Sequence, residues 1–292
     1  MFADPNRNFG FSAAPAGRGI PATGGYQVSG KWPVVTGCED AQWCLLAGLV
    51  MDVDAPRQRN GGPDGRLFLI PTAALAIAPT WQDAAVMQGT GSNEASVQDV
   101  FVPEAFAYSP AQPALIDRPH FRPPMSVFGY PLNAAVVLGV LGSALESAVD
   151  AIGSKVASIS GQTLRDQQPI QELVADCDAA LRAARAGVLA ALDAVWDLAS
   201  TGADIPLKLR AQLYASLFYA ADVARDTVSR LYARGTRAAF MHNHPLERAL
   251  RNQHALAFAD EKVKLYFYEA AQGGRYNEYR APTNPARELT LS

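Results

Sequence analysis

Residues 87–103 read MQGTGSNEASVQDVFVP, and this stretch divides the chain into two kinds of sequence. A Gly-Thr-Gly-Ser turn opens it, and its two glycines are free to adopt positive φ. A run rich in β-branched and aromatic residues follows, and Pro103 ends that run because proline cannot continue a paired strand. The stretch therefore predicts a tight turn that leads into a strand.

Before this turn, short apolar runs alternate with turn residues. Residues 24–30 place Tyr26 and Val28 on one face of a strand, and residues 42–51 form an apolar run that suits a strand buried on both faces. Residues 1–23 are rich in Gly, Pro, Ala and Asn, so we expect a loop with at most one short strand. About five to seven short strands in this half predict a small β-sandwich or barrel.

After residue 125 the apolar period changes to three and four residues, which is typical of amphipathic helices. In the first of these helices the buried stripe is expected to hold Val136, Val137, Val140, Leu141, Leu145, Ala148, Val149, Ile152 and Val156. The pattern predicts a bundle of four helices, at residues 128–158, 170–200, 206–235 and 245–272.

The fold class predicted from these patterns is α+β, a small sandwich or barrel followed by a four-helix bundle. The expected domains are a β-domain at residues 1–115, a proline-rich linker at 116–127, the bundle at 128–275 and a tail at 276–292.

Composition narrows the class of protein. The chain has 292 residues, of which 49% are hydrophobic and 18% charged, so it can bury a large core. A formal net charge of −3 gives no general reason to expect nucleic acid as a partner. Three cysteines without a Cys-x-x-Cys spacing suggest core thiols and a cytoplasmic location. The most apolar window, residues 134–145, is shorter than the roughly 20 residues needed to span a bilayer, so no membrane is expected.

Three motifs carry a resemblance to a known family. They are GGYQVSGKWPVVTGC at residues 24–38, the stretch at 87–103, and HPLERALRNQHA at residues 244–255. In this order and spacing they resemble the middle β-domain and C-terminal helical domain of the acyl-CoA dehydrogenase superfamily. The chain looks most similar to the branch of two-component flavin-dependent monooxygenases.

The resemblance implies a flavin site on an oxidoreductase. FMN or FAD is the implied cofactor, and in the monooxygenase branch a partner reductase supplies it in reduced form. A hydroxyl and backbone N–H groups suit the polar edge of the flavin ring, and arginines suit its phosphate or a carboxylate. The implied cofactor-binding residues are Thr36, Gly37, Gly89, Thr90, Gly91, Ser92, Arg165, Arg248 and Arg251.

The sequence also departs from the family pattern. Gln88 stands where the family usually has Arg, and Asn252 where it has Asp. Asp260 occupies the position of the catalytic glutamate of true acyl-CoA dehydrogenases, which leaves a dehydrogenase with Asp260 as its base as an alternative. Met1 falls where the family's N-terminal helical domain has already ended, so a truncated non-catalytic or structural subunit is a further alternative.

The expected partners follow from the same resemblance. They are a second copy of this chain, in a dimer or tetramer through the bundle, a flavin reductase, and a chain that supplies the missing N-terminal domain. His242 and His244 are interpreted as part of a helix-entry turn rather than as metal ligands, because no third ligand stands at a suitable spacing.

Overall fold

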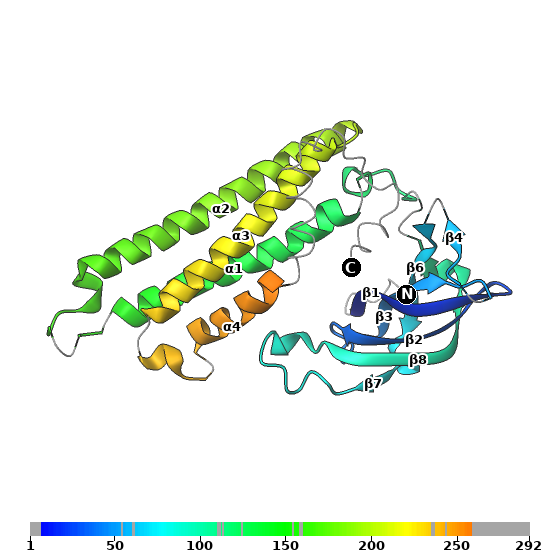
Figure 1. Cartoon of the computed structure of the whole chain (residues 1–292), viewed down its shortest axis with the longest axis horizontal. Coiled ribbons are helices and arrows are strands. Elements are labelled where there is room, and N and C mark those ends of the chain that lie inside the picture. Colours follow the sequence, from blue (N-terminus) through cyan, green and yellow to red (C-terminus); the bar gives the residue numbers. More distant parts are fainter. Residues whose placement is uncertain are drawn as a thin grey trace. The chain divides into compact units, whose positions relative to one another are not determined.

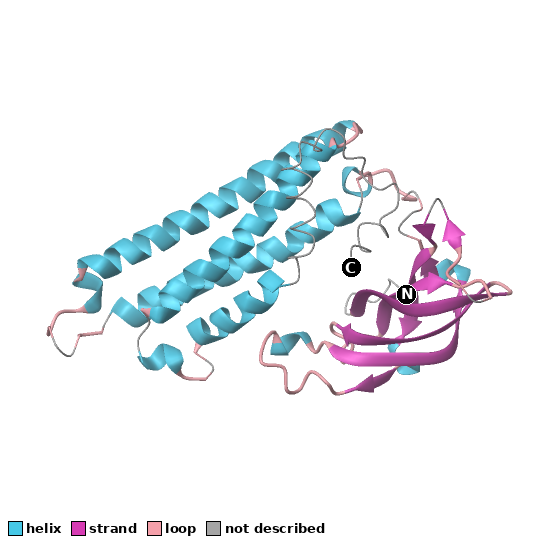
Figure 2. Ribbon diagram, in the orientation of Figure 1, coloured by secondary structure: helices cyan, strands magenta, loops and turns pink. Residues whose placement is uncertain are grey.

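The computed structural model describes residues 7–258, apart from residues 54, 60–61, 110–111, 113, 124, 154, 158–159, 235–236 and 243. The chain forms two compact units with a boundary at residue 114. The first unit is built from strands and the second from four long helices (Figures 1 and 2). The α+β fold class predicted from the sequence is therefore confirmed.

Seven strands of the first unit form one mixed sheet in the order β7-β8-β2-β1-β3-β6-β9. Strands β1 and β3 are parallel, and the other neighbours are antiparallel. A separate two-stranded ribbon joins β4 (Gln58–Arg59) to β5 (Gly62–Pro63). The strands of the sheet are β1 (Phe9–Ala22), β2 (Gly25–Val35), β3 (Trp43–Val50), β6 (Gly65–Pro71), β7 (Ala76–Ala78), β8 (Asn93–Pro103) and β9 (Ala107–Tyr108).

The sheet curls around its own core. Strands β2 and β6 are three positions apart, so a flat sheet would hold them about 14 Å from one another. Yet the rings of Tyr26 on β2 and Phe68 on β6 have their centroids only 5.6 Å apart. Both rings are buried, together with Val28 and Trp32. The small β-domain predicted from the sequence is thus a strongly curved sheet whose concave face is the core.

Strand β1 corrects the expectation that residues 1–23 form a loop. It lies between β2 and β3 and pairs with both of them. The register with β3 shifts between Ser12 and Gly17, and this irregularity contains Pro15, which a regular central strand would not accept.

The glycines that suggested a loop in β1 are required by close packing. A Cβ atom at Gly17 would lie 2.6 Å from the ring of Trp32, and one at Gly19 would lie 2.5 Å from the ring of Phe68. Such distances are shorter than any real carbon contact, so only glycine leaves room for the two aromatic core residues.

The other predicted strands and the four helices are confirmed. The helices are α1 (Met125–Gly153), α2 (Gln168–Thr201), α3 (Leu207–Ala233) and α4 (Pro245–Phe258). Helix α3 packs against each of the other three, and α1 also contacts α2 and α4. The expected continuation of the fourth helix to residue 272 lies outside the described residues.

Part of the stripe expected on the first helix is wrong. Val137, Leu141 and Ile152 are buried as predicted, but Val136 is 46% and Val149 43% exposed. The helix ends at Gly153, so Val156 lies beyond it and pairs instead with Thr163 in an isolated bridge. The apolar run in the sequence therefore predicts a wider buried face for α1 than the structure has.

Helix α1 extends well beyond the apolar window of residues 134–145, so length alone does not exclude a membrane-spanning helix. An 18-residue window within Val127–Gly153 has a mean hydropathy of 1.7, so this segment is long and apolar enough to cross a membrane by length and composition. Core helices of soluble proteins pass the same test, and α1 supplies Val137 and Leu141 to the bundle core.

The proline-rich segment is attached to the helical unit through Arg122. The Arg122 side chain donates hydrogen bonds to the Asp117 carboxylate. It also donates to the carbonyl groups of Ala199 and Ser200 at the end of α2. The Ala199 carbonyl also accepts the backbone N–H of Gly202 over 3.2 Å, so Arg122 adds a side-chain cap to the backbone cap at the C-terminus of α2.

Candidate functional site

Two parts of the predicted cofactor site, Thr36 and the glycine turn at residues 89–92, lie together in the β unit. Thr36 follows β2 directly and is held against β1 by two backbone hydrogen bonds with Phe11, each 3.0 Å long. The next residue, Gly37, donates its N–H to the carbonyl of Thr90 over 2.9 Å. The structure thus brings the strand end at Thr36 and Gly37 against the turn at residues 89–92, which lies more than 50 residues away.

The turn begins and ends with left-handed backbone. Met87 has φ 50° and Gly91 has φ 51°, and the 3₁₀ turn Gln88–Thr90 lies between them. The left-handed conformation at Gly91 explains the need for glycine there. A Cβ atom added at Gly37 or at Gly89 would meet no other atom within 4 Å, so both glycines border open space.

Three hydroxyl groups form a row across the site. Thr36 Oγ1 lies 3.0 Å from Ser92 Oγ, and Ser92 Oγ lies 2.8 Å from Thr90 Oγ1. Thr90 Oγ1 in turn donates to the carbonyl oxygen of Met87 over 2.8 Å. Ser92 is buried and Thr36 is exposed, so the row runs from the surface into the turn.

A second set of contacts supports the turn, and sequence reasoning missed it. The Asn93 side chain is 1% exposed, donates from Nδ2 to Glu39 Oε1 over 2.6 Å and accepts from the backbone N–H of Trp81 over 2.8 Å. The Trp81 ring donates from Nε1 to the carbonyl of Met87 over 3.1 Å. The sequence indicates this supporting role only through the position of Asn93, a polar residue directly between the turn and a β-rich run.

Cys38 packs beneath the turn. It is a free, buried thiol whose Sγ lies 3.7 Å from the carbonyl oxygen of Gly91. Burial raises the pKa of this thiol. Cys38 belongs to the buried core of the β unit, which confirms its interpretation as a core residue.

An apolar surface adjoins the exposed hydroxyl of Thr36. Phe11 lies opposite Thr36 across the bridge, and cross-strand partners project to the same side of a sheet. Phe11 is 42% exposed, and Val34, two residues before Thr36, is 43% exposed. The site therefore offers a hydroxyl and backbone groups beside an apolar face. This combination suits a flat ring system that carries polar atoms along one edge.

The two predicted arginines of α4 have different surroundings. Arg251 forms a bidentate pair with Glu247, with Nε–Oε1 at 2.5 Å and Nη2–Oε2 at 3.2 Å. The hydrogen bond from Arg251 holds the pKa of Glu247 below its usual value. Arg248 is exposed and forms no ion pair with any described residue. Of the two, Arg248 is the cation that remains available to a ligand.

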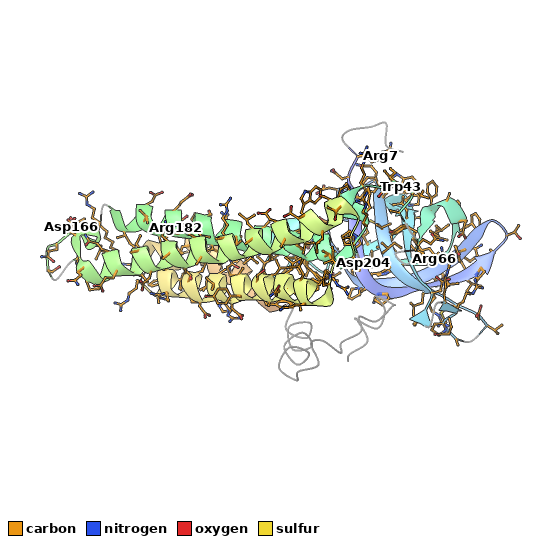
Figure 3. The ribbon with its side chains drawn as sticks, turned by 90° about the horizontal axis from the view of Figure 1, so that it is seen from above. Arg7, Trp43, Arg66, Asp166, Arg182 and Asp204 are labelled. Atoms are coloured by element: carbon orange, nitrogen blue, oxygen red, sulfur yellow. The ribbon has the colours of Figure 1, made fainter. Side chains whose placement is uncertain are left out.

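Two further predicted residues are Arg165 and Asp260. Arg165 lies in the 3₁₀ turn Leu164–Asp166, at the end of the bundle where Asp166 is labelled in Figure 3. Its side chain is 68% exposed and lies 3.7 Å from the Asp166 carboxylate. Asp260 lies outside the described residues.

His244 acts at the start of α4, as the interpretation of a helix-entry turn predicts. Its Nδ1 accepts the backbone N–H of Leu246 over 3.2 Å, one of the N–H groups that a helix start leaves unpaired.

Comparisons with known proteins agree with this architecture. Residues 132–259 match the acyl-CoA dehydrogenase, C-terminal domain, family. The helical unit is therefore an acyl-CoA dehydrogenase C-terminal-like domain, and the resemblance inferred from the sequence is confirmed.

Similar proteins narrow the relationship further. The chain is 30% identical to the oxygenase subunit HsaA of a flavin-dependent monooxygenase from Rhodococcus jostii (strain RHA1) over 258 residues, which are 84% of this chain and 64% of that protein. It is 32% identical over 156 residues, 53% of this chain and 37% of the relative, to the oxygenase component of an FADH(2)-dependent resorcinol hydroxylase from Rhizobium sp. (strain MTP-10005). The chain is a homologue of the HsaA-type flavin-dependent monooxygenases.

Solved structures share the fold. The crystal structure of 3-HSA hydroxylase from Rhodococcus sp. RHA1 superposes with a TM-score of 0.83 at 25% identity, over 96% of this chain and 73% of that one. The HsaA monooxygenase from M. tuberculosis gives a TM-score of 0.79 at 26% identity, over 93% and 72%. The chain spans 64% of the length of the HsaA proteins that it matches in sequence.

Proposed function

We propose that this chain acts in the oxygenase component of a flavin-dependent monooxygenase, with reduced flavin supplied by a separate reductase. The observation that carries the proposal is the contact between Thr36 and the turn at residues 89–92, which forms a polar edge beside an apolar surface. The homology to oxygenase subunits that use flavin supports it.

The residues present fit a flavin ring. Ring carbonyls and nitrogens require hydrogen-bond partners at one edge, which the Thr36 hydroxyl and the backbone of the glycine turn offer. The apolar part of the ring requires a flat apolar neighbour, which Phe11 and Val34 offer. The open space at Gly89 leaves the backbone there accessible, whereas the N–H of Gly37 is already bonded to the Thr90 carbonyl. When bound, reduced flavin supplies the electrons that activate oxygen.

Arg248 is the proposed partner of the flavin phosphate. It is an exposed cation, whereas Arg251 is already engaged by Glu247. Both FMN and FAD carry a phosphate, and an arginine binds phosphate through charge-assisted hydrogen bonds. The relative from Rhizobium is named as dependent on FADH(2), which favours FAD over FMN.

The substrate, partners and location are proposed on the same basis. Resorcinol, named in one relative, is an aromatic compound, so we propose an aromatic substrate. The word oxygenase component in the name of that relative implies a separate reductase. We further propose that copies of the chain associate through the helical unit and that the protein is cytoplasmic.

A flavin titration tests the site. The full chain is mixed with oxidised or anaerobically reduced FMN and FAD, and binding is followed by absorbance and fluorescence. We expect saturable binding that Thr36→Val weakens by about tenfold, because the ring loses a hydrogen-bond partner. Thr201→Val is the matched control, since Thr201 lies exposed at the end of α2. Binding in neither redox state would contradict the proposal.

A second measurement separates the proposed activity from its alternatives. A monooxygenase consumes oxygen with an added reductase and an aromatic substrate. A dehydrogenase that uses Asp260 as its base would instead reduce bound flavin with an acyl-CoA in the absence of oxygen. A non-catalytic subunit would do neither, although it would still bind its partner chains.

A further inference from the structure

One long side of α2 is exposed to solvent. The buried residues of this helix lie along the opposite side, at Ile170, Cys177, Ala184, Val188, Val195 and Ala199. The exposed side, which we call the outer face of α2, consists of Ala175, Ala179, Arg182, Arg185, Ala186, Leu189, Asp193, Trp196 and Asp197. Arg182, Leu189 and Trp196 within it are seven residues apart, a spacing that keeps side chains on one line along a helix. Such a line can face a second helix over several turns.

The middle of this face carries apolar and small side chains. Leu189 and Trp196 are 49% and 45% exposed. The Trp196 ring meets the ring of Phe128 on α1 edge-on, with centroids 6.1 Å apart, so the neighbouring helix holds it in place. Ala179 and Ala186 add little bulk beside them, which lets another helix approach closely. The outer face therefore presents an apolar strip that a second helix can cover.

Charge on the outer face is separated along the helix. Arg182 and Arg185 lie in its first half, whereas Asp193 and Asp197 lie in its second half. The two aspartates are one turn apart near the C-terminal end of α2, so they repel one another and the negative end of the helix dipole. Within the described part of the chain neither forms an ion pair, and Arg182 has only an exposed pair with Asp178 at 2.9 Å. Positive charge from another molecule would therefore stabilise the second half of the face.

A second copy of α2 supplies that charge when it runs antiparallel. In a pair with two-fold symmetry centred on Leu189, residues equally far before and after this position meet. Arg185 then meets Asp193 of the second copy. Arg182 meets Trp196 of the second copy and lies beside Asp197. An arginine pairs with a carboxylate and also stacks on an indole ring. We propose that this chain forms a dimer in which the outer faces of two α2 helices pack antiparallel about Leu189.

The parallel orientation is unfavourable. In a parallel pair each residue meets its own counterpart, so Arg185 would face Arg185 and Asp193 would face Asp193, and like charges would repel. The antiparallel pair instead forms every charge contact twice, once on each side of the two-fold axis. The inference rests on the proposed association through the helical unit, which it makes specific, and it does not involve the flavin site.

A charge exchange in the full chain tests the pairing. Arg185→Asp places two carboxylates opposite each other and Asp193→Arg places two guanidinium groups opposite each other. Each is therefore expected to raise the dissociation constant of the dimer at least about tenfold. The double variant restores opposite charges and is expected to restore the dimer, which a merely misfolded single variant would not do. Asp226→Arg on α3 is the control, because Asp226 is 72% exposed and lies outside the outer face of α2. Sedimentation velocity measures all four variants at about 50 mM and about 500 mM salt, and the unmodified dimer should be weaker at the higher concentration.

A cysteine cross-link tests the direction of the two helices. The two-fold axis brings both copies of residue 189 together, so Leu189→Cys is expected to give a disulfide-linked dimer with the oxidant diamide. Ala175→Cys is the matched control on the same face, two heptads away from Leu189. In the antiparallel pair the two copies of residue 175 lie about 42 Å apart, too far for a disulfide, whereas a parallel pair would join them. The native cysteines are buried and serve as an internal reference for the oxidation.

The combined results decide between the outcomes. Weaker association in each single exchange, recovery in the double variant and a cross-link at residue 189 alone support the inference. A dimer that the exchanges leave unchanged, or that cross-links at residue 175, overturns the antiparallel pairing while association of the helical unit stands. An unmodified chain that sediments as a monomer overturns both. Flavin titration of the same samples reads the flavin site separately, because none of these substitutions lies in it.

Discussion

Gln253 of α4 donates a hydrogen bond from its Nε2 to the carbonyl oxygen of Val137 in α1, over 2.7 Å. The Gln253 side chain is 1% exposed, and its Oε1 has no hydrogen-bond partner within the described part of the chain. A carbonyl in the middle of a helix already accepts a bond from its own helix. The contact therefore fixes the register of α4 on α1 but leaves a buried acceptor unsatisfied.

Replacing Gln253 by leucine is expected to leave the free energy of unfolding unchanged or to raise it by up to about 1 kcal/mol. The lost hydrogen bond is worth about 1 kcal/mol, and removing a buried unsatisfied acceptor returns a similar amount. Urea denaturation measures the change. Gln253→Ala is the comparison, and it should lower stability by about 2 kcal/mol because it leaves a cavity. Equal losses in the two variants would contradict this account of Oε1.

Gly19 is expected to be intolerant of alanine. A Cβ atom there would lie 2.5 Å from the Phe68 ring, so the ring must move within the core. Overpacking of this kind lowers the free energy of unfolding by about 1–3 kcal/mol. Gly65→Ala on β6 is the matched control, because a Cβ atom at that position meets nothing within 4 Å and should change stability by less than about 0.5 kcal/mol. A Gly19→Ala variant as stable as the control would show that the Phe68 ring yields freely.

These contacts explain which parts of the fold the sequence predicts. Local patterns mark the turn before β8 and the four helices, because turn residues and apolar periods are local properties. Strand β1 has no such mark. Its glycines exist because Trp32 and Phe68, remote in sequence, approach its backbone, and that information is not contained in residues 1–23.

The candidate site divides in the same way. Thr36 and the turn at 89–92 were indicated by family resemblance, and the structure adds that they touch. The roles of Glu39, Asn93 and Trp81 depend on side chains that meet across 12 to 54 residues, so no single motif contains them. The contact of Gln253 with Val137 could not be predicted for a similar reason, because the apolar period of a helix does not reveal a buried polar contact to another helix.

Arg122→Gln is expected to lower the thermal midpoint of unfolding, because the last carbonyls of α2 lose their cap. The bond from Arg122 lowers the pKa of Asp117 in the folded protein. A lowered pKa means that this pair stabilises the fold above the unfolded pKa of Asp117, near 4, and that the contribution is lost as the pH falls through the folded value.

The pH dependence is checked with Asp117→Asn. Its thermal midpoint should lie below that of the unmodified chain at pH 7, and the difference should shrink as the pH falls below about 4. A difference that stays constant down to pH 2 would show that the Asp117 charge does not contribute. Arg122→Gln should keep part of its deficit at low pH, because the bonds from Arg122 to the helix carbonyls do not titrate.

Arg248 and Arg251 provide the last and most direct test of the ligand site in the helical unit. Arg251 is 25% and Glu247 13% exposed, and the two form a bidentate pair one helical turn apart. Arg251→Gln should therefore raise the pKa of Glu247 toward its usual value and cost about 0.5 kcal/mol of stability at pH 7. Because the folded pKa of Glu247 is lowered, this contribution is present above its unfolded pKa and disappears as the pH falls through the lowered value.

Arg248→Gln should leave stability almost unchanged but weaken flavin binding. Arg248 forms no ion pair with the described residues, so stability is expected to change by less than about 0.5 kcal/mol. If Arg248 binds the flavin phosphate, its loss weakens flavin binding by about tenfold, and the dependence of Kd on salt becomes shallower because one charge contact is gone. Titrations at 50 mM and 500 mM salt with both variants measure this, together with urea denaturation. A larger loss of affinity in Arg251→Gln than in Arg248→Gln would reverse the assignment, since it would mean that Arg251 leaves Glu247 to bind the phosphate.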